Sequence, residues 1–290
     1  LGLRHRGILT NDLVGALSKL VFYVAAPALL FRATATGTLD ETFNPSAMVV
    51  VAVVTVIVGA GTYLLCFRCH PDRRGVIAQG AFRSNQVFIG LPTVIYAFGE
   101  EAVRVVAVQV SLTVILYNFL GAVFLILPQQ ERSARSAAVW GRTAVKVARN
   151  PLIIASAAGI LYSLTDLPLP LVADRTLALL GQTAAPLALL TVGAGLEFGR
   201  LRGDLGTTAV VSLVKNVLYP ALILAGLHLA GLRGLDLQAP LMLMVAPGAV
   251  IGYVMTRDLG GDEKLAGSIV IGSTLLSLLT ITAWLAWLGG

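Results

Sequence analysis

Charged residues are scarce in this sequence, and their scarcity decides its class. Only 12% of the 290 residues are Asp, Glu, Lys or Arg, whereas 57% are hydrophobic. Apolar runs of about 20 residues, long enough to cross a bilayer core of about 30 Å as helices, follow one another along the chain. The sequence therefore predicts an all-α integral membrane protein, with the lipid bilayer as its partner. The net charge of +6 resides in short loops between these runs, which argues against nucleic acid as a partner.

Cysteine and histidine are equally rare, with two and three copies. Two cysteines cannot form a disulfide framework. Cys66-Phe-Arg-Cys69-His70 has the spelling of a c-type haem attachment site, but the charge pattern places it on the cytoplasmic side. Its three candidate ligands also fall one short of structural zinc, so we interpret the thiols as reduced and incidental. Without a nucleophile–base pair or a ligand set, the sequence predicts no catalytic residue, no metal, no cofactor and no enzyme.

Hydropathy and turn signals together predict nine membrane spans. They cover residues 11–33, 45–67, 73–98, 101–127, 150–165, 172–198, 205–230, 236–259 and 262–288. The only long polar connection, residues 129–149, separates residues 1–128 from residues 150–290. We expect this linker to divide two domains.

Basic residues are distributed unevenly over the loops. If the loops alternate between the two sides, one side receives fourteen Lys and Arg residues and the other side only four. The side rich in positive charge is cytoplasmic in membrane proteins. The 129–149 linker is then cytoplasmic, and the carboxyl terminus lies outside.

Three landmarks recur in the same order at nearly one spacing, which predicts a duplicated half. Pro27 and Pro186 are 159 residues apart, Pro92 and Pro247 are 155 apart, and Glu101 and Glu263 are 162 apart. The span at 150–165, shifted by this offset, would have a partner that precedes residue 1, so we expect a first repeat that lacks most of its first helix. With that helix restored each repeat has five spans, and an odd number forces the second repeat to be inverted.

Pro92 and Pro247 each lie inside a long apolar run, with Gly90 and Gly248 beside them. A proline in mid-helix removes a backbone hydrogen bond and clashes with the preceding turn. The released backbone groups are tolerated at membrane depth only where they line a cavity or pack against protein, and half-helix amino termini there favour an anion. Each proline alone could be a simple kink, but their pairing favours two broken helices that cross at a binding site. We interpret the other proline pair, which has fewer polar neighbours, as kinks of a scaffold.

Three basic residues, Lys19, Arg83 and Lys215, lie within predicted spans, where a charge is costly and is by default a functional hypothesis. We interpret Lys19 as extending its side chain to water. Arg83 is two residues from Asn85 and either contacts a substrate or extends its long side chain to water. Lys215 is the deepest, with no acid in its own span. It could attract an anion, replace a coupling cation, or serve packing.

Five motifs occur in order along almost the whole chain. They are Leu17-Ser-Lys-Leu-Val-Phe-Tyr-Val-Ala-Ala-Pro-Ala-Leu-Leu-Phe31, Asn85-x4-Gly90-x-Pro92, Ala185-Pro-Leu-Ala-Leu-Leu-Thr-Val-Gly193, Leu213-Val-Lys215-x4-Pro220 and Gly261-Asp-Glu-Lys-Leu-Ala266. Together they resemble the PIN-like auxin efflux carrier family of membrane transporters, in its bacterial form.

The resemblance implies ten helices in two inverted five-helix repeats with crossing broken helices, as in the folds of bile-acid symporters and sodium–proton antiporters. It also implies an elevator-type secondary transporter, often a homodimer, in which a mobile domain slides against a scaffold. Plant relatives export auxin, and bacterial relatives are associated with malonate, malate and similar carboxylates. The implied substrate is therefore a small organic anion, such as a carboxylate or an auxin-like acid, carried across a bacterial inner membrane.

Carried onto this sequence, the resemblance makes Asn85 the leading substrate contact, with backbone near Pro247 completing the site. Bacterial relatives often place an asparagine shortly after the second proline, where this chain has Val250-Ile-Gly-Tyr253. We therefore expect an asymmetric site. The expected substrate-binding residues are Asn85, Gly90, Pro92, Pro247, Gly248, Gly252, Tyr253, Lys215 and Arg83.

No aspartate or glutamate lies at the middle of any predicted span. Cation-coupled relatives of this architecture usually keep a carboxylate at the crossing, so the sequence favours uniport or coupling through the substrate itself. Two alternatives stay open, a cation–proton antiporter of the same architecture and a ligand-binding membrane sensor.

Overall fold

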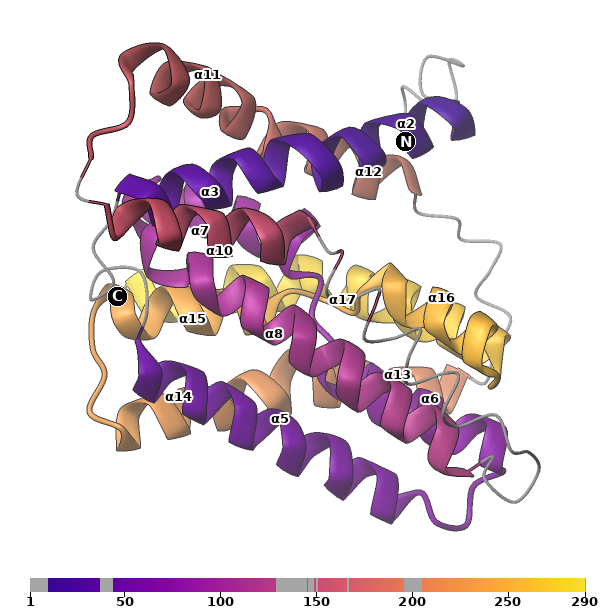
Figure 1. Cartoon of the computed structure of the whole chain (residues 1–290). Helices are drawn as coiled ribbons and strands as arrows, with labels where there is room; N and C mark the ends of the chain where they lie inside the picture. Colours follow the sequence, from indigo (N-terminus) through magenta and orange to yellow (C-terminus); the bar gives the residue numbers. More distant parts are fainter. Residues whose placement is uncertain are drawn as a thin grey trace. The chain divides into compact units, whose positions relative to one another are not determined.

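The computed structural model describes residues 10–36, 44–128, 145, 149, 151–165, 167–195 and 205–289 (Figure 1). Within these ranges every regular element is a helix, apart from one isolated β-bridge. The all-α prediction is confirmed for this part of the chain. Most of the predicted 129–149 linker lies outside the described residues.

Nine helical segments in the described ranges match the nine predicted spans to within a few residues. Writing η for a π-helical turn, they are α2 (Asn11–Leu20) with η1 (Val21–Ala25) and α3 (Ala26–Thr36); α5 (Pro45–Leu65); α6 (Pro71–Phe82) with η2 (Gln86–Gly90) and α7 (Leu91–Phe98); α8 (Glu101–Ile126); α10 (Pro151–Ser163); α11 (Leu171–Gln182) with α12 (Ala184–Gly195); α13 (Leu205–Leu213) with η5 (Val214–Leu218) and α14 (Tyr219–Leu229); α15 (Leu235–Val245) with α16 (Val250–Leu259); and α17 (Glu263–Gly289).

Five of these segments are long and apolar enough to cross a membrane. They are Asp12–Thr36, Pro45–Leu65, Glu101–Ile126, Leu205–Leu229 and Glu263–Leu288. Three shorter apolar helical stretches, Gln86–Phe98, Pro151–Ser163 and Leu235–Val245, accompany them. This set of lengths combines full spans with half-length helices, as expected where a helix is broken at membrane depth.

The helix starts recur along the chain. Segments begin at residues 11 and 171, 45 and 205, 71 and 235, and 101 and 263, so the offset stays between 160 and 164. The break between α6 and α7 has a counterpart between α15 and α16, whereas α5 is unbroken and its counterpart contains η5. The inversion of one half relative to the other stays a prediction.

Three π-helical turns each end two residues before a proline: η1 before Pro27, η2 before Pro92 and η5 before Pro220. A proline inside a helix removes one hydrogen bond, and its ring clashes with a carbonyl of the preceding turn. A π-turn carries one extra residue and is a common way to absorb such a misfit. The helical path therefore continues through all three prolines.

The prediction that Pro92 breaks its helix is wrong for this reason. Gln86 to Phe98 is continuously helical, and Pro92, the second residue of α7, lies just after the π-turn η2 that absorbs its misfit. The break lies instead at Arg83–Asn85, where the backbone is extended. The matching break at Pro247 is confirmed, because residues 246–249 are not helical.

The helices group into two compact units. Unit 1 comprises residues 1–44, 86–112 and 148–196, and unit 2 comprises residues 45–85, 113–147 and 197–290. Each unit takes segments from both sides of the 129–149 linker. The predicted repeats, residues 1–128 and 150–290, are units of sequence duplication and differ from these compact units. That division stays a prediction.

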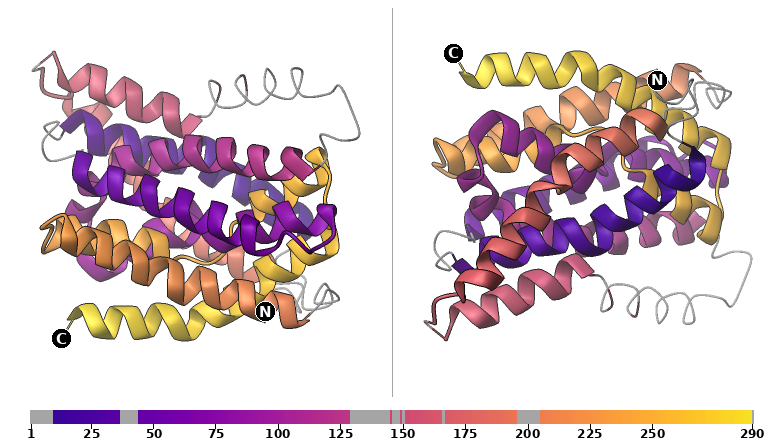
Figure 2. Two further views of the ribbon diagram at one scale, coloured as in Figure 1. Left: turned by 90° about the horizontal axis from the view of Figure 1, so that it is seen from below. Right: turned by 90° about the horizontal axis from the view of Figure 1, so that it is seen from above.

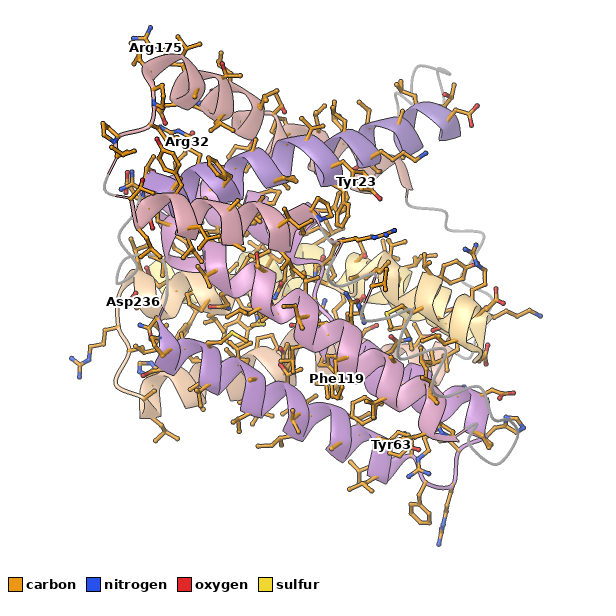
Figure 3. All side chains as sticks on the ribbon, in the orientation of Figure 1. Tyr23, Arg32, Tyr63, Phe119, Arg175 and Asp236 are labelled. Carbon is orange, nitrogen blue, oxygen red and sulfur yellow. The ribbon has the colours of Figure 1, made fainter. Side chains whose placement is uncertain are left out.

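Unit 1 is held by close packing of α3 on α10 and by short polar contacts. A Cβ on Gly159 would collide with Thr34 Oγ1, so only glycine allows this approach. Ser156 Oγ lies 2.7 Å from Ser111 Oγ, which joins α10 to α8. Arg32, labelled in Figure 3, donates from its Nε to Asp174 Oδ1 at 2.7 Å and so joins α3 to α11.

Unit 2 has an apolar core between α6, α8, α13 and α17. Its buried members are Val76, Ile77, Leu125, Val211, Leu265, Ala266 and Ile269. Figure 2 shows α13 and α17 side by side in both views, in agreement with their packing. Near the end of α5 the Arg74 guanidinium carbon lies 3.8 Å from the centroid of the Tyr63 ring, a cation–π contact. Tyr63 is labelled in Figure 3.

Candidate functional site

The first break of unit 2 follows directly from α6. Gln79 and Arg83 are four residues apart and so share one face of this helix. The Arg83 amide still donates to Gln79 O at 3.1 Å, but Arg83 itself has extended backbone angles (φ −70°, ψ 105°). Helical bonding stops there, and Ser84 and Asn85 continue as extended chain.

The second break of unit 2 separates α15 from α16. Ala246, which precedes a proline, is extended (φ −53°, ψ 141°), as expected for the residue before proline. Ala249 is extended as well (φ −83°, ψ 134°), and α16 begins after it without a side-chain cap. The break thus gives α16 an amino terminus of its own within unit 2.

The two breaks cross and pair as a minimal antiparallel ladder. Ser84 and Gly248 form the bridge. The Asn85 amide donates to Pro247 O at 2.7 Å, and the Ala249 amide donates to Arg83 O at 3.2 Å. Backbone groups that leave a helix at membrane depth must find partners within the protein, and here each break supplies them to the other.

Two serines fasten this crossing. Ser84 Oγ donates to Met244 O at 3.1 Å, near the end of α15. Ser273 Oγ, on α17, accepts the Gly248 amide at 3.0 Å. A Cβ on Gly248 would lie 2.9 Å from the same Ser273 oxygen, so glycine is required for the approach of the second break to α17.

Arg83 places a positive charge inside unit 2. The residue is 3% exposed. Its Nη1 donates to Tyr117 O at 2.9 Å and its Nη2 donates to Asn118 Oδ1. Its Nε is buried without a hydrogen-bond partner among the described residues. The guanidinium is therefore held by two neutral oxygens, and none of the described carboxylates pairs with it.

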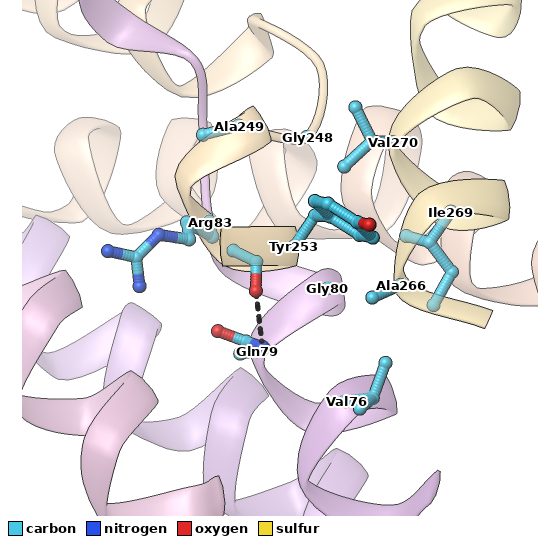
Figure 4. A pocket seen from close by; sticks show the side chains of 11 residues that line it. Val76, Gln79, Gly80, Arg83, Gly248, Ala249, Tyr253, Ala266, Ile269 and Val270 are labelled. Atoms are coloured by element: carbon cyan, nitrogen blue, oxygen red, sulfur yellow. Dashed lines mark hydrogen bonds between the residues drawn. The ribbon is translucent and has the colours of Figure 1, made fainter. Parts of the chain in front are cut away.

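A small pocket, partly open to solvent, lies at the crossing (Figure 4). Gln79 crosses it, and its Nε2 donates to Gly252 O at 3.1 Å and to Thr256 Oγ1 at 2.8 Å. The Gln79 Oε1 atom is buried with no partner among the described residues. The lining residues are Val76, Gln79, Gly80, Arg83, Gly248, Ala249, Gly252, Tyr253, Ala266, Ile269 and Val270.

Lys215 is fully buried in unit 2, outside the lining of this pocket. Its Nζ donates to Met244 O at 2.8 Å and to Ala246 O at 2.7 Å. Its ammonium therefore lies on the last carbonyls of α15. The neighbouring Asn216 Nδ2 donates to Ser273 O at 2.7 Å, so η5 contacts both the end of α15 and the serine that fastens the crossing.

The structure brings most of the expected site residues of unit 2 together. Arg83, Gly248, Gly252 and Tyr253 line the pocket. Asn85 and Pro247 are joined by a backbone hydrogen bond at the crossing. Lys215 is buried outside the pocket lining and donates to Ala246 O at the second break. Gly90 and Pro92 belong to unit 1, which is described by itself. Contact of any of these residues with a substrate stays a prediction.

Sequence reasoning missed three contributors to this site. Gln79 could have been found, because an amide four residues before a buried arginine shares its helix face. Ser273 and Tyr117 carry no local signal, since a lone serine or tyrosine in an apolar span is ordinary. Their roles depend on contacts with residues at least 25 positions away along the chain.

No group of three or more His, Cys, Asp or Glu side chains that could hold a metal ion occurs within the described ranges. Cys66 and Cys69 are free thiols. Burial, followed by the neighbouring Cys69, raises the pKa of Cys66 to about 11. A thiol with so high a pKa is a poor nucleophile and a poor metal ligand at neutral pH.

Comparison with known proteins assigns the family. The sequence profile of the family described as "Membrane transport protein" matches residues 1–285. An "Uncharacterized transporter" of Methanothermobacter thermautotrophicus is 24% identical over 97% of this chain and 91% of its own length. A "Putative malonate transporter" of Rhizobium meliloti is 26% identical over 98% and 92%. A "Probable auxin efflux carrier component 5c" of Oryza sativa subsp. japonica is 26% identical over 50% and 41%. This chain belongs to the auxin efflux carrier family of membrane transport proteins, and it is an integral membrane transporter.

Proposed function

We propose that this transporter carries a small organic anion of the carboxylate class, and that the anion binds at the crossing beside Arg83. The observation that carries the proposal is a buried guanidinium whose hydrogen-bond partners among the described residues are neutral oxygens. A buried charge without a counter-charge is costly. A carboxylate ligand would supply the counter-charge, and arginine is the side chain best suited to bind one.

The pocket suits a small, polar ligand. Its lining sets Gln79 and Arg83 beside apolar side chains such as Ile269, and small-molecule sites likewise combine apolar walls with a few polar groups. The free Arg83 N–H is a donor for a carboxylate oxygen, and Gln79 Oε1 can accept from a hydroxyl or a protonated acid. Ala249 and Gly252, at the start of α16, also line it, and the helix dipole attracts negative charge to a helix amino terminus.

The relatives agree with this substrate class. One is named for malonate and one for auxin efflux, and both compounds are organic acids. The expected contacts of Asn85, Pro247, Gly248, Gly252, Tyr253 and Lys215 with the substrate, all in unit 2, belong to this proposal. For Gly90 and Pro92, in unit 1, substrate contact stays a prediction of the sequence alone.

An elevator mechanism is part of the proposal. Unit 2 holds both strands of the crossing, Arg83 and the pocket. A mobile domain that carries an intact site past a scaffold needs this kind of division. We infer unit 2 as the mobile part and unit 1 as the scaffold. The proposal also includes inverted repeats, a homodimer and a bacterial inner-membrane location. In it the linker is cytoplasmic and the carboxyl terminus is external.

Uptake of radiolabelled malonate and a panel of other carboxylates into proteoliposomes tests the substrate class. Arg83→Ala should raise KM about 10- to 100-fold, because a hydrogen bond to a charged group contributes about 1.5–3 kcal/mol. Arg83→Lys should retain part of the affinity, since it keeps the charge but loses the planar fork. Arg104→Ala is the matched control, because Arg104 is paired with Glu101 outside this site.

Transport of no acid by folded protein would reject the substrate class. Wild-type kinetics in Arg83→Ala, with equal incorporation into the vesicles, would remove Arg83 from the site. The same vesicles separate the alternatives. A sodium-driven pH change would indicate a cation–proton antiporter, and carboxylate binding without flux would indicate a sensor.

A further inference from the structure

The Lys215 ammonium occupies an unusual place for a charged group. Lys215 lies 10 residues from the start of the Leu205–Leu229 segment, or about 15 Å along a helix, close to half of a bilayer core of about 30 Å. It is 0% exposed. No ion pair between Lys215 and a carboxylate occurs among the described residues.

The atoms that receive this charge are backbone oxygens at a helix end. Met244 is the last residue but one of α15, and Ala246 is its C-cap. The final carbonyls of a helix have no partners within it, and they carry the negative end of the helix dipole. In transporters with broken helices, such half-helix ends and unwound carbonyls are where a coupling Na⁺ or H⁺ binds. Distances of 2.8 and 2.7 Å from Nζ place the ammonium nitrogen directly in such a position.

The surrounding structure holds Lys215 in place. It is the second residue of η5, whose wider turn precedes Pro220. Asn216, next to it, is bonded to Ser273, and the Tyr219 ring centroid lies 5.2 Å from Nζ. Lys215 is thus presented by a fixed segment of backbone and does not reach the carbonyls by chance.

We propose that the Lys215 ammonium is a covalently attached cation in a monovalent-cation site formed by the carboxyl end of α15. The lysine organises the second break permanently, so the wild-type protein needs no Na⁺ or other free cation to form the crossing. Removal of the side chain empties the site, which then takes a small free cation, an alkylammonium best of all. This inference extends the proposed function by assigning ion independence to the same crossing, but the cation site itself does not depend on which substrate is carried.

Thermal unfolding of the purified protein, in a series of chlorides at constant ionic strength, tests the proposal. The cations are methylammonium, ammonium, sodium and the bulky N-methyl-D-glucamine. Wild-type protein should unfold at one temperature in all four. Lys215→Ala should unfold at a lower temperature in N-methyl-D-glucamine, and methylammonium or ammonium should restore part of the loss in a saturable manner, as expected for binding to the folded state. Lys215→Met, which fills the space without a charge, should be destabilised but not restored.

Three results would overturn the proposal. One is a folded Lys215→Ala protein with the same midpoint in every cation. Another is equal restoration of Lys215→Met, which would place the cation elsewhere. The third is saturable stabilisation of wild-type protein by sodium, and this arm decides the question even where neither variant can be purified. Restored stability together with no carboxylate transport would uphold the cation site and reject only the proposed substrate.

Discussion

Gly248→Ala measures how tightly the crossing is packed. An alanine Cβ would lie 2.9 Å from Ser273 Oγ, whereas the next atom is 3.7 Å away. The clash is therefore with one hydroxyl, which also accepts the Gly248 amide at 3.0 Å. Overpacking by a methyl group costs about 1–3 kcal/mol, and the strained hydrogen bond is worth about 0.5–1.5 kcal/mol. We expect a loss of unfolding free energy of about 2–4 kcal/mol.

Ser273→Ala provides the second side of a double-mutant cycle. Alone it loses the bond to Gly248 and should cost about 0.5–1.5 kcal/mol. In the double variant the new methyl group occupies the space that the hydroxyl left. The double variant should therefore be about 1–2 kcal/mol more stable than the sum of the two single losses, within the usual range for residues in contact.

Denaturant unfolding in detergent gives the four free energies. Gly61→Ala is the matched control, because it lies in α5 of the same unit and its Cβ would meet no atom within 4 Å. Alanine favours a helix over glycine by about 1 kcal/mol, so the control should be neutral or slightly stabilised. If Gly248→Ala matched Gly61→Ala, or if the two losses were simply additive, the close approach of the second break to α17 would be refuted.

Three further changes test other parts of the structure. Asn85→Ala should slow carboxylate uptake but leave membrane insertion intact, because the bond to Pro247 uses the backbone amide; unchanged uptake would remove the side chain from the site. Gly159→Ala should destabilise unit 1 by about 1–3 kcal/mol, since its Cβ meets Thr34, and an unchanged unfolding midpoint would contradict this packing. Maleimide at pH 8 should modify exposed Cys69 before Cys66, whose raised pKa keeps it protonated; mass spectrometry of timed samples would show the order, and equal rates would refute the burial of Cys66.

The sequence predicted where the helices lie, and the reason is physical. Apolar runs and turn residues mark a span regardless of what it packs against, so all nine segments were located to within a few residues. The same local logic failed at Pro92. The energetic cost of a proline is local, but the π-turn η2 that absorbs it is a response of the backbone that hydropathy does not encode.

The true position of the first break depends on tertiary contacts. Ser84 leaves the helix because Gly248 and Met244, more than 150 residues away, receive its bridge and its hydroxyl bond. Lys215 illustrates the same limit. Its depth was readable from the sequence, but its partners are backbone carbonyls, which any residue type provides. Residue identity could therefore indicate a buried cation and could not indicate what it binds.

The two buried cations of unit 2 give the proposed cycle an electrical asymmetry. If unit 2 moves, its empty form crosses the membrane field with the charges of Arg83 and Lys215, and a bound monoanion cancels one of them. Moving one charge across an inside-negative potential of about 100 mV changes its energy by about 2.3 kcal/mol. This energy would favour the position of the empty unit 2 in which its site faces the cytoplasm, where it can bind substrate. The membrane voltage would then favour export of the carboxylate over its import. Carboxylate efflux from vesicles clamped with valinomycin should rise with that potential, and a voltage-independent rate would contradict this direction.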